Sequence, residues 1–232
     1  MSDYTNSVPT SNYTSGPLDR LGWWASALVA LTGAISLIAT LALTGQYYVL
    51  DLYDRREIEL SDPAISSIEI TVASLFVGFG LFFLAGGIVF LFWVYRASAN
   101  IHAVDPSAME ITPGWAVGWN FIPIATLWKP YQAIRQIWQA SHNLQAPESV
   151  PVPNLFVWWW TFWIITQFIN PSWEDDVSVL DGGEIGEAQS DTIWSIAEFV
   201  TVAAACYFLF RIIREINRVQ KTMASNTASV FE

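Results

Sequence analysis

Residues 114–138 read GWAVGWNFIPIATLWKPYQAIRQIW, a stretch that is apolar and rich in tryptophan. Pro123 and Pro130 interrupt it, and its later half carries charge at Lys129 and Arg135. The part before Lys129 is shorter than the roughly 20 residues that a membrane span needs. It is also too apolar for an ordinary loop, since loops are normally polar. We therefore expect this segment to act at a membrane surface.

The composition of the whole chain favours a membrane protein. Hydrophobic residues make up 53% of its 232 residues and charged residues only 13%, whereas soluble domains carry about 25% charge. Thirteen tryptophans agree with this, because tryptophan gathers where hydrocarbon meets headgroups. The net charge of −11 argues against binding nucleic acid. The single cysteine, Cys206, excludes an intrachain disulfide and a cysteine metal cluster.

Four stretches meet or approach the roughly 20 apolar residues that a span requires. They are residues 21–44, 70–95, 152–170 and 192–211, of which the third is the shortest. We predict an all-α integral membrane protein, a four-transmembrane-helix bundle. Between spans 2 and 3 it carries a cytoplasmic interfacial or re-entrant element and an amphipathic helix. Residues 17–222 form this membrane domain, with a disordered tail at 1–16 and a second tail at 223–232.

The basic residues predict the orientation of the spans, because they gather on the cytoplasmic side. Only Arg55 and Arg56 of the ten fall on the opposite side. The others are Arg20, Arg96, Lys129, Arg135, Arg211, Arg214, Arg218 and Lys221. Both termini are therefore expected in the cytoplasm.

The two outer connections are acidic. The first holds Asp51, Asp54, Glu57, Glu59 and Asp62, and the second holds Glu174, Asp175, Asp176, Asp181, Glu184 and Glu187. A divalent-cation site is one interpretation, because hard cations prefer clustered carboxylates. The spacing fits no known loop motif, so we favour a solvated acidic surface.

The aromatic residues at the span ends support this model. The inner boundary holds Trp23, Trp24, Trp93 and residues 158–160, and the outer boundary holds Tyr47, Tyr48, Trp173 and Trp194. Interfacial rings form such belts. The Trp158–Trp160 triplet would also suit a flat cofactor, but we favour belt and packing.

The interfacial element spans residues 112–144 and divides at its two prolines. Thr112 suits an N-cap and Pro113 the first helical position, so a short helix is expected to begin there. Pro123 should kink or end it, because proline lacks a backbone donor. Pro130 starts a second helix with an apolar stripe at Tyr131, Ile134, Ile137, Trp138 and Leu144. This second helix has the form of one that lies in the interface plane.

Three placements compete for residues 114–128: a surface helix, a re-entrant hairpin and a fifth span. As a helix, the fifteen residues would reach only about 22 Å. A fifth span would also move the C-terminal basic residues outside. We favour an interfacial or shallow re-entrant placement.

The motifs of this element resemble those of a known family. They are Pro113-Gly-Trp-Ala-Val-Gly-Trp119, Phe121-Ile-Pro-Ile-Ala125, Leu127-Trp128, Pro130-Tyr-Gln-Ala-Ile-Arg135 and Ile137-Trp138. The chain thereby resembles a bacterial membrane family named domain of unknown function 4328, over about Pro17 to Lys221. Asn120 and Thr126 depart from the pattern, which bears on how deeply that turn is buried. The resemblance implies a bacterial inner-membrane protein and brings no activity, cofactor or ligand with it.

Glu198 is the strongest single candidate for a residue that binds a proton or an ion. It lies seven residues past Asp191, about 10 Å along a helix, and so inside the outer half of the bilayer. Ser195 and Thr201 share its face, and hydroxyl residues of other spans, such as Thr40, also lie toward the outer end. One interpretation is a proton or cation site in an outward-facing polar pocket. The other, which we favour, is a buried carboxyl that stays protonated and hydrogen-bonded.

His102 and His142 are the two histidines, and we expect both at the cytoplasmic surface. They are conceivable ligands of a pigment or haem, but no sequence spacing links them. Ordinary exposed histidines are the favoured interpretation, and neither has a nearby nucleophile for a triad.

The leading functional hypothesis is a non-enzymatic accessory or scaffold subunit of a membrane protein assembly. No catalytic constellation is found in the sequence, and the cytoplasmic element offers rigid aromatic surface for partners or lipids. The residues expected there are Trp115, Trp119, Trp128, Tyr131, Arg135 and Trp138. The alternative is a small transporter or channel component that uses Glu198, and a pigment- or haem-binding subunit ranks last. We predict no cofactor and no metal, with membrane lipids and other membrane subunits as partners.

Overall fold

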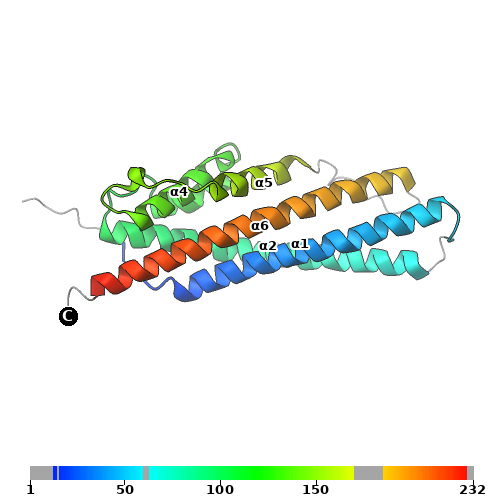
Figure 1. Ribbon diagram of the computed structural model, residues 1–232, viewed down its shortest axis with the longest axis horizontal. Helices are drawn as coiled ribbons and strands as arrows, with labels where there is room; N and C mark the ends of the chain where they lie inside the picture. The colour runs from blue at the N-terminus through cyan, green and yellow to red at the C-terminus, as the bar shows by residue number, and fades with distance from the viewer. Residues whose placement is uncertain (1–12, 15, 60–62, 170–184, 229–232) are drawn as a thin grey trace, which may run out of the picture. The chain divides into compact units, whose positions relative to one another are not determined.

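The computed structural model describes residues 13–14, 16–59, 63–169 and 185–228, the last five by their backbone alone. Helix accounts for 84% of the structure, and no strand occurs in the part of the chain described. The elements follow the order α1 (Asp19–Asp54), α2 (Pro63–Val104), α3 (Pro113–Gly118), η1 (Trp119–Phe121), η2 (Ala125–Leu127), α4 (Lys129–His142), η3 (Pro147–Ser149), α5 (Leu155–Ile169) and α6 (Ile185–Ala228) (Figure 1). The predicted all-α class is confirmed.

In the described part of the chain, three helices are long and apolar enough to cross a membrane: α1, α2 and α6. The predicted third span is a shorter apolar helix, α5, whose 15 residues reach about 22 Å. It begins only at Leu155, after Pro151 and Pro153. Proline lacks a backbone donor and disfavours helix in the residue before it, so the helix starts once both prolines are passed. Residue 170, the predicted end of this span, lies outside the described residues.

The long helices extend well past the predicted span ends. α1 was expected to end near Thr44 but continues to Asp54, into the acidic connection. Hydropathy marks the hydrocarbon layer and not the end of a helix. Beyond that layer, contact with another helix sustains the turns of α1, since Leu50 is buried against Ala188 of α6.

Just after the end of α1, the backbone of Arg56 adopts the left-handed conformation, with φ of 59°. The backbone N–H of Arg56 donates to the Tyr53 carbonyl at 3.0 Å, and that of Glu57 donates to the Leu52 carbonyl at 3.0 Å. This pair of bonds is a Schellman motif, which satisfies the last carbonyls of a helix.

Several predicted segments fall outside the described residues. They are most of the N-terminal tail, the acidic cluster from Glu174 to Glu184, and the last four residues of the C-terminal tail.

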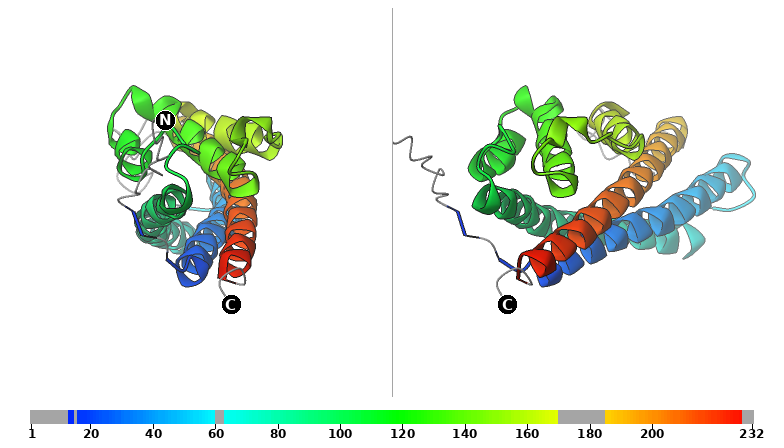
Figure 2. Two further views of the ribbon diagram at one scale, coloured as in Figure 1. Left: turned by 90° about the vertical axis from the view of Figure 1, so that its left-hand side faces the viewer. Right: turned by 60° about the vertical axis from the view of Figure 1, so that its left-hand side comes forward.

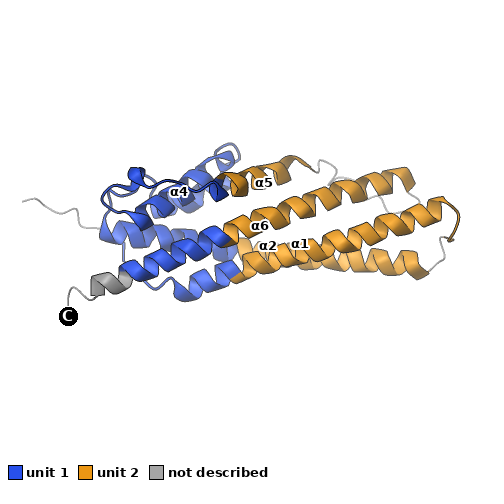
Figure 3. Cartoon of the chain, in the orientation of Figure 1, with its two compact units in different colours: residues 1–26, 88–156, 211–232 blue, residues 27–87, 157–210 orange. Residues whose placement is uncertain are grey.

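The chain divides into two compact units (Figure 3). Unit 1 comprises residues 1–26, 88–156 and 211–232, and unit 2 comprises residues 27–87 and 157–210. Unit 2 thus holds the later part of α1, the earlier parts of α2 and α6 and most of α5, and unit 1 holds the whole element between α2 and α5.

In unit 2, α1, α2 and α6 meet at Phe199. Figure 2 shows the ribbon of these helices from two further directions. Phe199 is buried with Ala39, Leu43 and Val72, and its ring meets those of Phe76 and Phe79 edge-on at 5.0 Å. Edge-to-face pairs of this kind add about 0.5–1.5 kcal/mol to the gain from burial. Phe199 of α6 therefore joins the three helices.

α5 joins this unit through stacked rings. Trp163 stacks on Phe83 of α2 at 6.2 Å, and Phe162 stacks on Phe208 of α6 at 5.9 Å. Within the predicted aromatic triplet, Trp159 is buried and Trp158 is exposed. At least one member of the triplet is therefore a packing residue.

α1 and α6 lie close together at Gly33 in unit 2. A Cβ added there would lie 3.0 Å from the Cβ of Cys206, tighter than most real Cβ contacts. Glycine at this position lets the two backbones approach closely.

We predict that Gly33→Leu lowers the thermal unfolding temperature of the detergent-solubilised protein. Overpacking a tight contact costs about 1–3 kcal/mol, which exceeds the gain of about 1 kcal/mol in helix propensity over glycine. Gly78→Leu on α2 is the matched control, because a Cβ there meets nothing within 4 Å. An equal rise in unfolding temperature for both variants would contradict the contact.

Candidate functional site

The site predicted from the sequence, the interfacial element, lies entirely in unit 1. It starts with α3, for which Thr112 is the N-cap residue and Pro113 the first helical residue, as predicted. The Thr112 side chain makes no capping hydrogen bond. The backbone carbonyl of Thr112 accepts from the Ala116 N–H at 2.8 Å. Pro113 and Ala116 are buried, so one side of this short helix faces protein.

Asn120 closes α3 at its other end. Its side-chain amide donates to the carbonyls of Ala116 at 3.2 Å and Val117 at 3.0 Å. These carbonyls belong to the last turn of α3, where the carbonyl groups of a helix have no N–H partner within the helix. Asn120 thus acts as a polar cap on this turn.

Two tryptophans form the base of the element. The rings of Trp115 and Trp119 stack with centroids 4.6 Å apart, and the Lys129 ammonium lies 5.4 Å from the Trp119 ring. A cation at this distance from an indole face is attracted by about 0.5–1 kcal/mol at exposed sites. The stack and the cation hold the start of the element against the start of α4.

The middle of the element, residues 121–124, is its most exposed part. Phe121 and Ile124 each expose 72% of their surface. Pro123 stands between them in a turn, and η2 follows with Thr126 N–H bonded to the Ile122 carbonyl at 2.8 Å. We call residues 121–124 the tip.

The short helix and the two 3-10 turns rule out a continuous fifth span through residues 114–128. α3 ends at Gly118 after six residues, and the backbone then turns at Pro123. A span requires a helix of roughly 20 residues.

α4 is amphipathic as predicted, but its apolar face is covered by protein. Ile134, Ile137 and Trp138 are all buried, together with Ala133, Gln139, Ala140 and Ser141. The prediction that this helix lies in the interface plane, with its stripe in lipid, is therefore wrong. The stripe is part of the core of unit 1, in contact with the start of α5, where Phe156 meets the Trp138 ring at 5.2 Å.

The predicted interaction residues therefore separate into two groups. Trp115 and Trp128 are exposed, as is Arg135, and Trp119 is half-buried in its stack. Trp138 is buried, and Tyr131 is half-buried with its ring edge-on to Phe156 at 6.4 Å. Only the first group offers a surface.

A buried amide joins the helices beneath the element. Gln220 of α6 donates to the Ala97 carbonyl of α2 at 3.1 Å and to the Ser141 hydroxyl of α4 at 3.0 Å. Its oxygen accepts from the Asn100 amide at 3.2 Å, and the Asn100 oxygen accepts from Gly16 N–H at 2.9 Å. One side chain thus links α2, α4 and α6, and through Asn100 the segment before α1.

A second amide of α6 lies one turn earlier. Asn217 accepts from the Trp93 indole N–H at 2.7 Å, and Gly22 of α1 leaves space for it, since a Cβ there would lie 2.2 Å from the Asn217 amide nitrogen. The amides at 217 and 220 lie beside the buried Ile213 and Ile216. Sequence reasoning missed both, although two amides next to an apolar helical stripe are a readable signal for a buried polar network.

The two histidines have different surroundings. His102 is buried, so the prediction that it is exposed is wrong; its Nδ1 lies 3.0 Å from the Ser98 carbonyl and its ring 5.5 Å from that of Tyr13. His142 is exposed as predicted, with Nδ1 2.8 Å from the Trp138 carbonyl. Among the described residues, no group of three or more His, Cys, Asp or Glu side chains is arranged to hold a metal ion.

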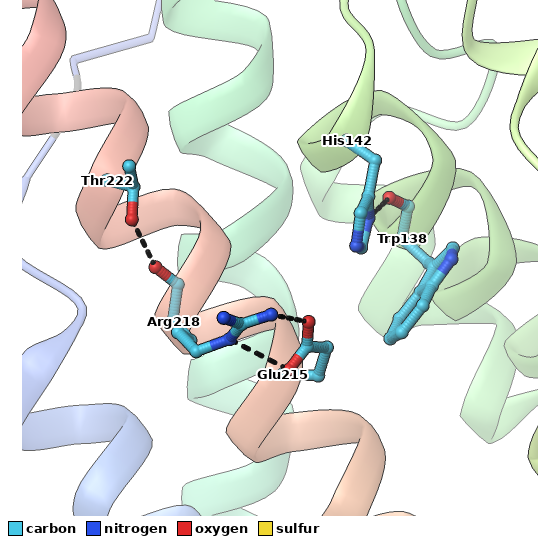
Figure 4. A network of polar contacts seen from close by, with 5 residues as sticks. All are labelled: Trp138, His142, Glu215, Arg218 and Thr222. Carbon is cyan, nitrogen blue, oxygen red and sulfur yellow. Dashed lines mark hydrogen bonds and ion pairs between the residues drawn. The ribbon is translucent and has the colours of Figure 1, made fainter.

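His142 lies near an ion pair on α6 (Figure 4). The Arg218 Nε donates to Glu215 Oε2 at 3.0 Å, and Nη2 pairs with Oε1. The hydrogen bond from Arg218 lowers the pKa of the Glu215 carboxyl, with smaller help from the charges of His142 and Arg211. Because the Arg218 side chain is 73% exposed, the pair is a solvated surface feature.

Glu198 lies half-buried on α6 in unit 2, and Ser195 is half-buried as well. The Thr201 hydroxyl, expected to share a polar pocket with Glu198, donates to the Ala197 carbonyl of its own helix at 2.6 Å. Thr40 likewise donates to the Ser36 carbonyl of α1 at 2.9 Å. These hydroxyl protons are used within single helices, so they add no support to a proton or cation site.

The fold and this element define a helical membrane protein with a covered amphipathic helix and an exposed apolar turn. The family model described as domain of unknown function (DUF4328) matches residues 56–218, well over half of the chain. The chain therefore belongs to this family, as its motifs predicted. Neither the curated proteins nor the solved structures contain a match to the chain.

We predict that Gln220→Leu lowers the thermal unfolding temperature, because it leaves buried partners such as Ser141 without their hydrogen bond. Orphaned buried polar groups cost about 1–3 kcal/mol. Gln132→Leu is the matched control, since Gln132 is exposed on α4. Equal unfolding temperatures for the two variants would show that the network contributes nothing.

Proposed function

We propose that this protein is a non-enzymatic, multi-pass protein of the bacterial inner membrane that acts as an accessory or scaffold subunit of a membrane assembly. The observation that carries the proposal is a face of α2 that is rich in small residues and that no other described residue covers. A partner helix on this face would complete the packing.

α2 is the least covered of the three long helices. Only 6% of its most apolar 18-residue window is buried, against 33% in α1 and 39% in α6. Its glycines separate in the same way. A Cβ at Gly86 would meet Leu28 of α1 at 3.6 Å, whereas Gly78, Gly80 and Gly87 have nothing within 4 Å among the described residues. Of these four glycines of α2, only Gly86 is explained by close packing against another described helix.

We place the partner site at Gly80 and Gly87. Seven residues separate them, almost two helical turns or about 10 Å, so they lie on one side of α2. The exposed side chains of Val77 and Leu84 lie beside them along one edge. Helices associate in lipid by close packing, and glycines let their backbones approach. An exposed face of this kind suits a second membrane helix.

The contacts of α6 support a fourth crossing by α5, and with it both termini on one side. In unit 1 the end of α6 meets the start of α1, where Lys221 lies 3.4 Å from Asp19. In unit 2 the start of α6 packs on the end of α1 through Ala188 and Leu50. α1 and α6 are thus antiparallel.

The chain between α2 and α5 stays at the C-terminal end of α6, since Ser141 bonds Gln220. α5 begins against α4 in unit 1, where Phe156 meets Trp138, and in unit 2 its Phe162 stacks on Phe208 of α6. Since α5 alone reaches about 22 Å of a core about 30 Å thick, flanking residues would complete the crossing. The basic residues then assign the shared side of the termini to the cytoplasm.

We predict that the double variant Gly80→Leu, Gly87→Leu loses its membrane partner on gentle detergent extraction. The wild-type chain and the Gly78→Leu control should co-purify with a stoichiometric membrane protein, identified by mass spectrometry. Gly78 is equally open but lies on the opposite flank of the exposed face, two residues or about 200° from Gly80. Leucine favours helix over glycine by about 1 kcal/mol, so unfolding of α2 would not explain a loss.

Three outcomes would contradict the proposal. The wild-type chain emerges alone, or Gly78→Leu loses the partner as completely as the double variant. In the third, the complex contains only further copies of this chain, which excludes the accessory role even if α2 is the interface.

A further inference from the structure

We infer that the tip, residues 121–124, inserts shallowly into the lipid surface, with Trp115, Trp128 and Lys129 at the level of the headgroups. The ligand is the phospholipid monolayer itself, with anionic headgroups preferred. This inference concerns lipid binding by unit 1 and is separate from the α2 interface. It rests on the proposed function only for assigning the leaflet to the cytoplasmic side.

Exposure of the tip contrasts with the covered apolar faces of α4 and α6 in unit 1. Ile134 and Ile137 on α4, and Ile212, Ile213 and Ile216 on α6, expose at most 1% of their surface. Phe121 and Ile124 expose 72% each, and Ile122, Leu127 and Trp128 are exposed beside them. A water-facing unit does not normally leave such a contiguous apolar patch open, so the patch marks an interaction site.

The chemistry of the tip favours lipid over a protein partner. Phe121, Ile122, Pro123 and Ile124 carry no side-chain hydrogen-bonding group. The N–H groups that follow are used locally, with Leu127 bonded to the Ile124 carbonyl and Trp128 to the Ala125 carbonyl, both at 3.2 Å. The energetic centres of protein interfaces are enriched in Trp, Tyr and Arg. A purely hydrocarbon tip with tryptophans at its base has the composition of a membrane-interface anchor.

Charge favours a membrane surface in the same way. The chain carries 21 acidic residues and a net charge of −11, yet none of them lies between Glu110 and Glu148. The same segment holds Lys129 and the exposed Arg135. Basic residues next to an inserted segment are each worth about 1 kcal/mol of attraction to an anionic leaflet. The acid-free stretch removes the repulsion that the rest of the chain would create.

The backbone limits the depth of insertion. The tip interrupts the α-helical backbone, since η1 ends at Phe121 and Pro123 lies in a turn. Irregular backbone enters the hydrocarbon core only where protein or water shields it, and the exposure of the tip shows that protein does not. Interfacial segments bury their apolar side chains about 5–10 Å into the headgroup and acyl boundary. The tip therefore stops at that level.

The test uses the purified full-length chain in liposomes of phosphatidylethanolamine and phosphatidylglycerol. In a Cys206→Ala background, single cysteines replace Phe121, Ile124 or, as the control, Gln132, and carry an environment-sensitive fluorophore. Quenching is compared for iodide in water, a nitroxide lipid labelled near the headgroup and one labelled near the chain end. Unfolding temperatures confirm that each labelled protein is folded, which the exposure of all three positions favours.

We expect blue-shifted emission at 121 and 124, with stronger quenching by the nitroxide near the headgroup than by the one near the chain end. The fluorophore at 132 should be quenched by iodide. The effect at 121 and 124 should weaken in liposomes of phosphatidylcholine alone. Iodide quenching at 121 and 124 equal to that at 132 would overturn the inference. Strongest quenching by the chain-end nitroxide would replace it with a deep re-entrant loop, and protection from all three quenchers would replace it with a protein-covered tip.

Discussion

Hydrocarbon cannot form a hydrogen bond, and this constraint accounts for most of the structure. A peptide group in lipid must find its partner inside its own helix, so the segments that enter the membrane are long, unbroken helices. The hydroxyl groups of unit 2 obey the same rule. Thr32, Ser36, Thr40 and Thr44 each donate to the carbonyl four residues before, at 2.8–2.9 Å. Among the described non-α segments between α2 and α5, only residues 119–128 carry large exposed apolar side chains. The same rule limits how deeply this segment can enter the hydrocarbon layer.

The two units satisfy their polar groups in different ways. In unit 2 the hydroxyls of α1 donate within their own helix, and rings and small residues join the helices, as at Phe199 and Gly33. In unit 1, amides connect separate elements, with Gln220 and Asn217 of α6 at the centre. Buried polar networks specify one arrangement of helices because every alternative leaves a group unpaired. α6 thus contributes an aromatic contact in unit 2 and a polar contact in unit 1.

The sequence predicted what depends on local composition. Apolar runs identified the long helices, Thr112 and Pro113 marked the start of α3, and the motif from Pro113 to Trp138 identified the family. It failed where a pattern has two physical solutions. An amphipathic stripe is the same whether lipid or protein covers it, so the burial of Ile137 and Trp138 in the core of unit 1 was not readable. The burial of His102 and the exposure of Phe121 likewise depend on residues distant in sequence, such as Tyr13.

We propose a four-crossing chain whose interfacial element and termini share the cytoplasmic side. Accessibility of single cysteines, in the Cys206→Ala background, to a membrane-impermeant maleimide tests it directly. The account predicts that Glu57→Cys and Ser178→Cys react in intact spheroplasts, whereas Asp19→Cys, Gln132→Cys and Thr222→Cys react only after lysis. Protection of Ser178→Cys in intact spheroplasts together with reaction of Thr222→Cys would contradict it, because α5 would then not cross and the C-terminus would lie outside.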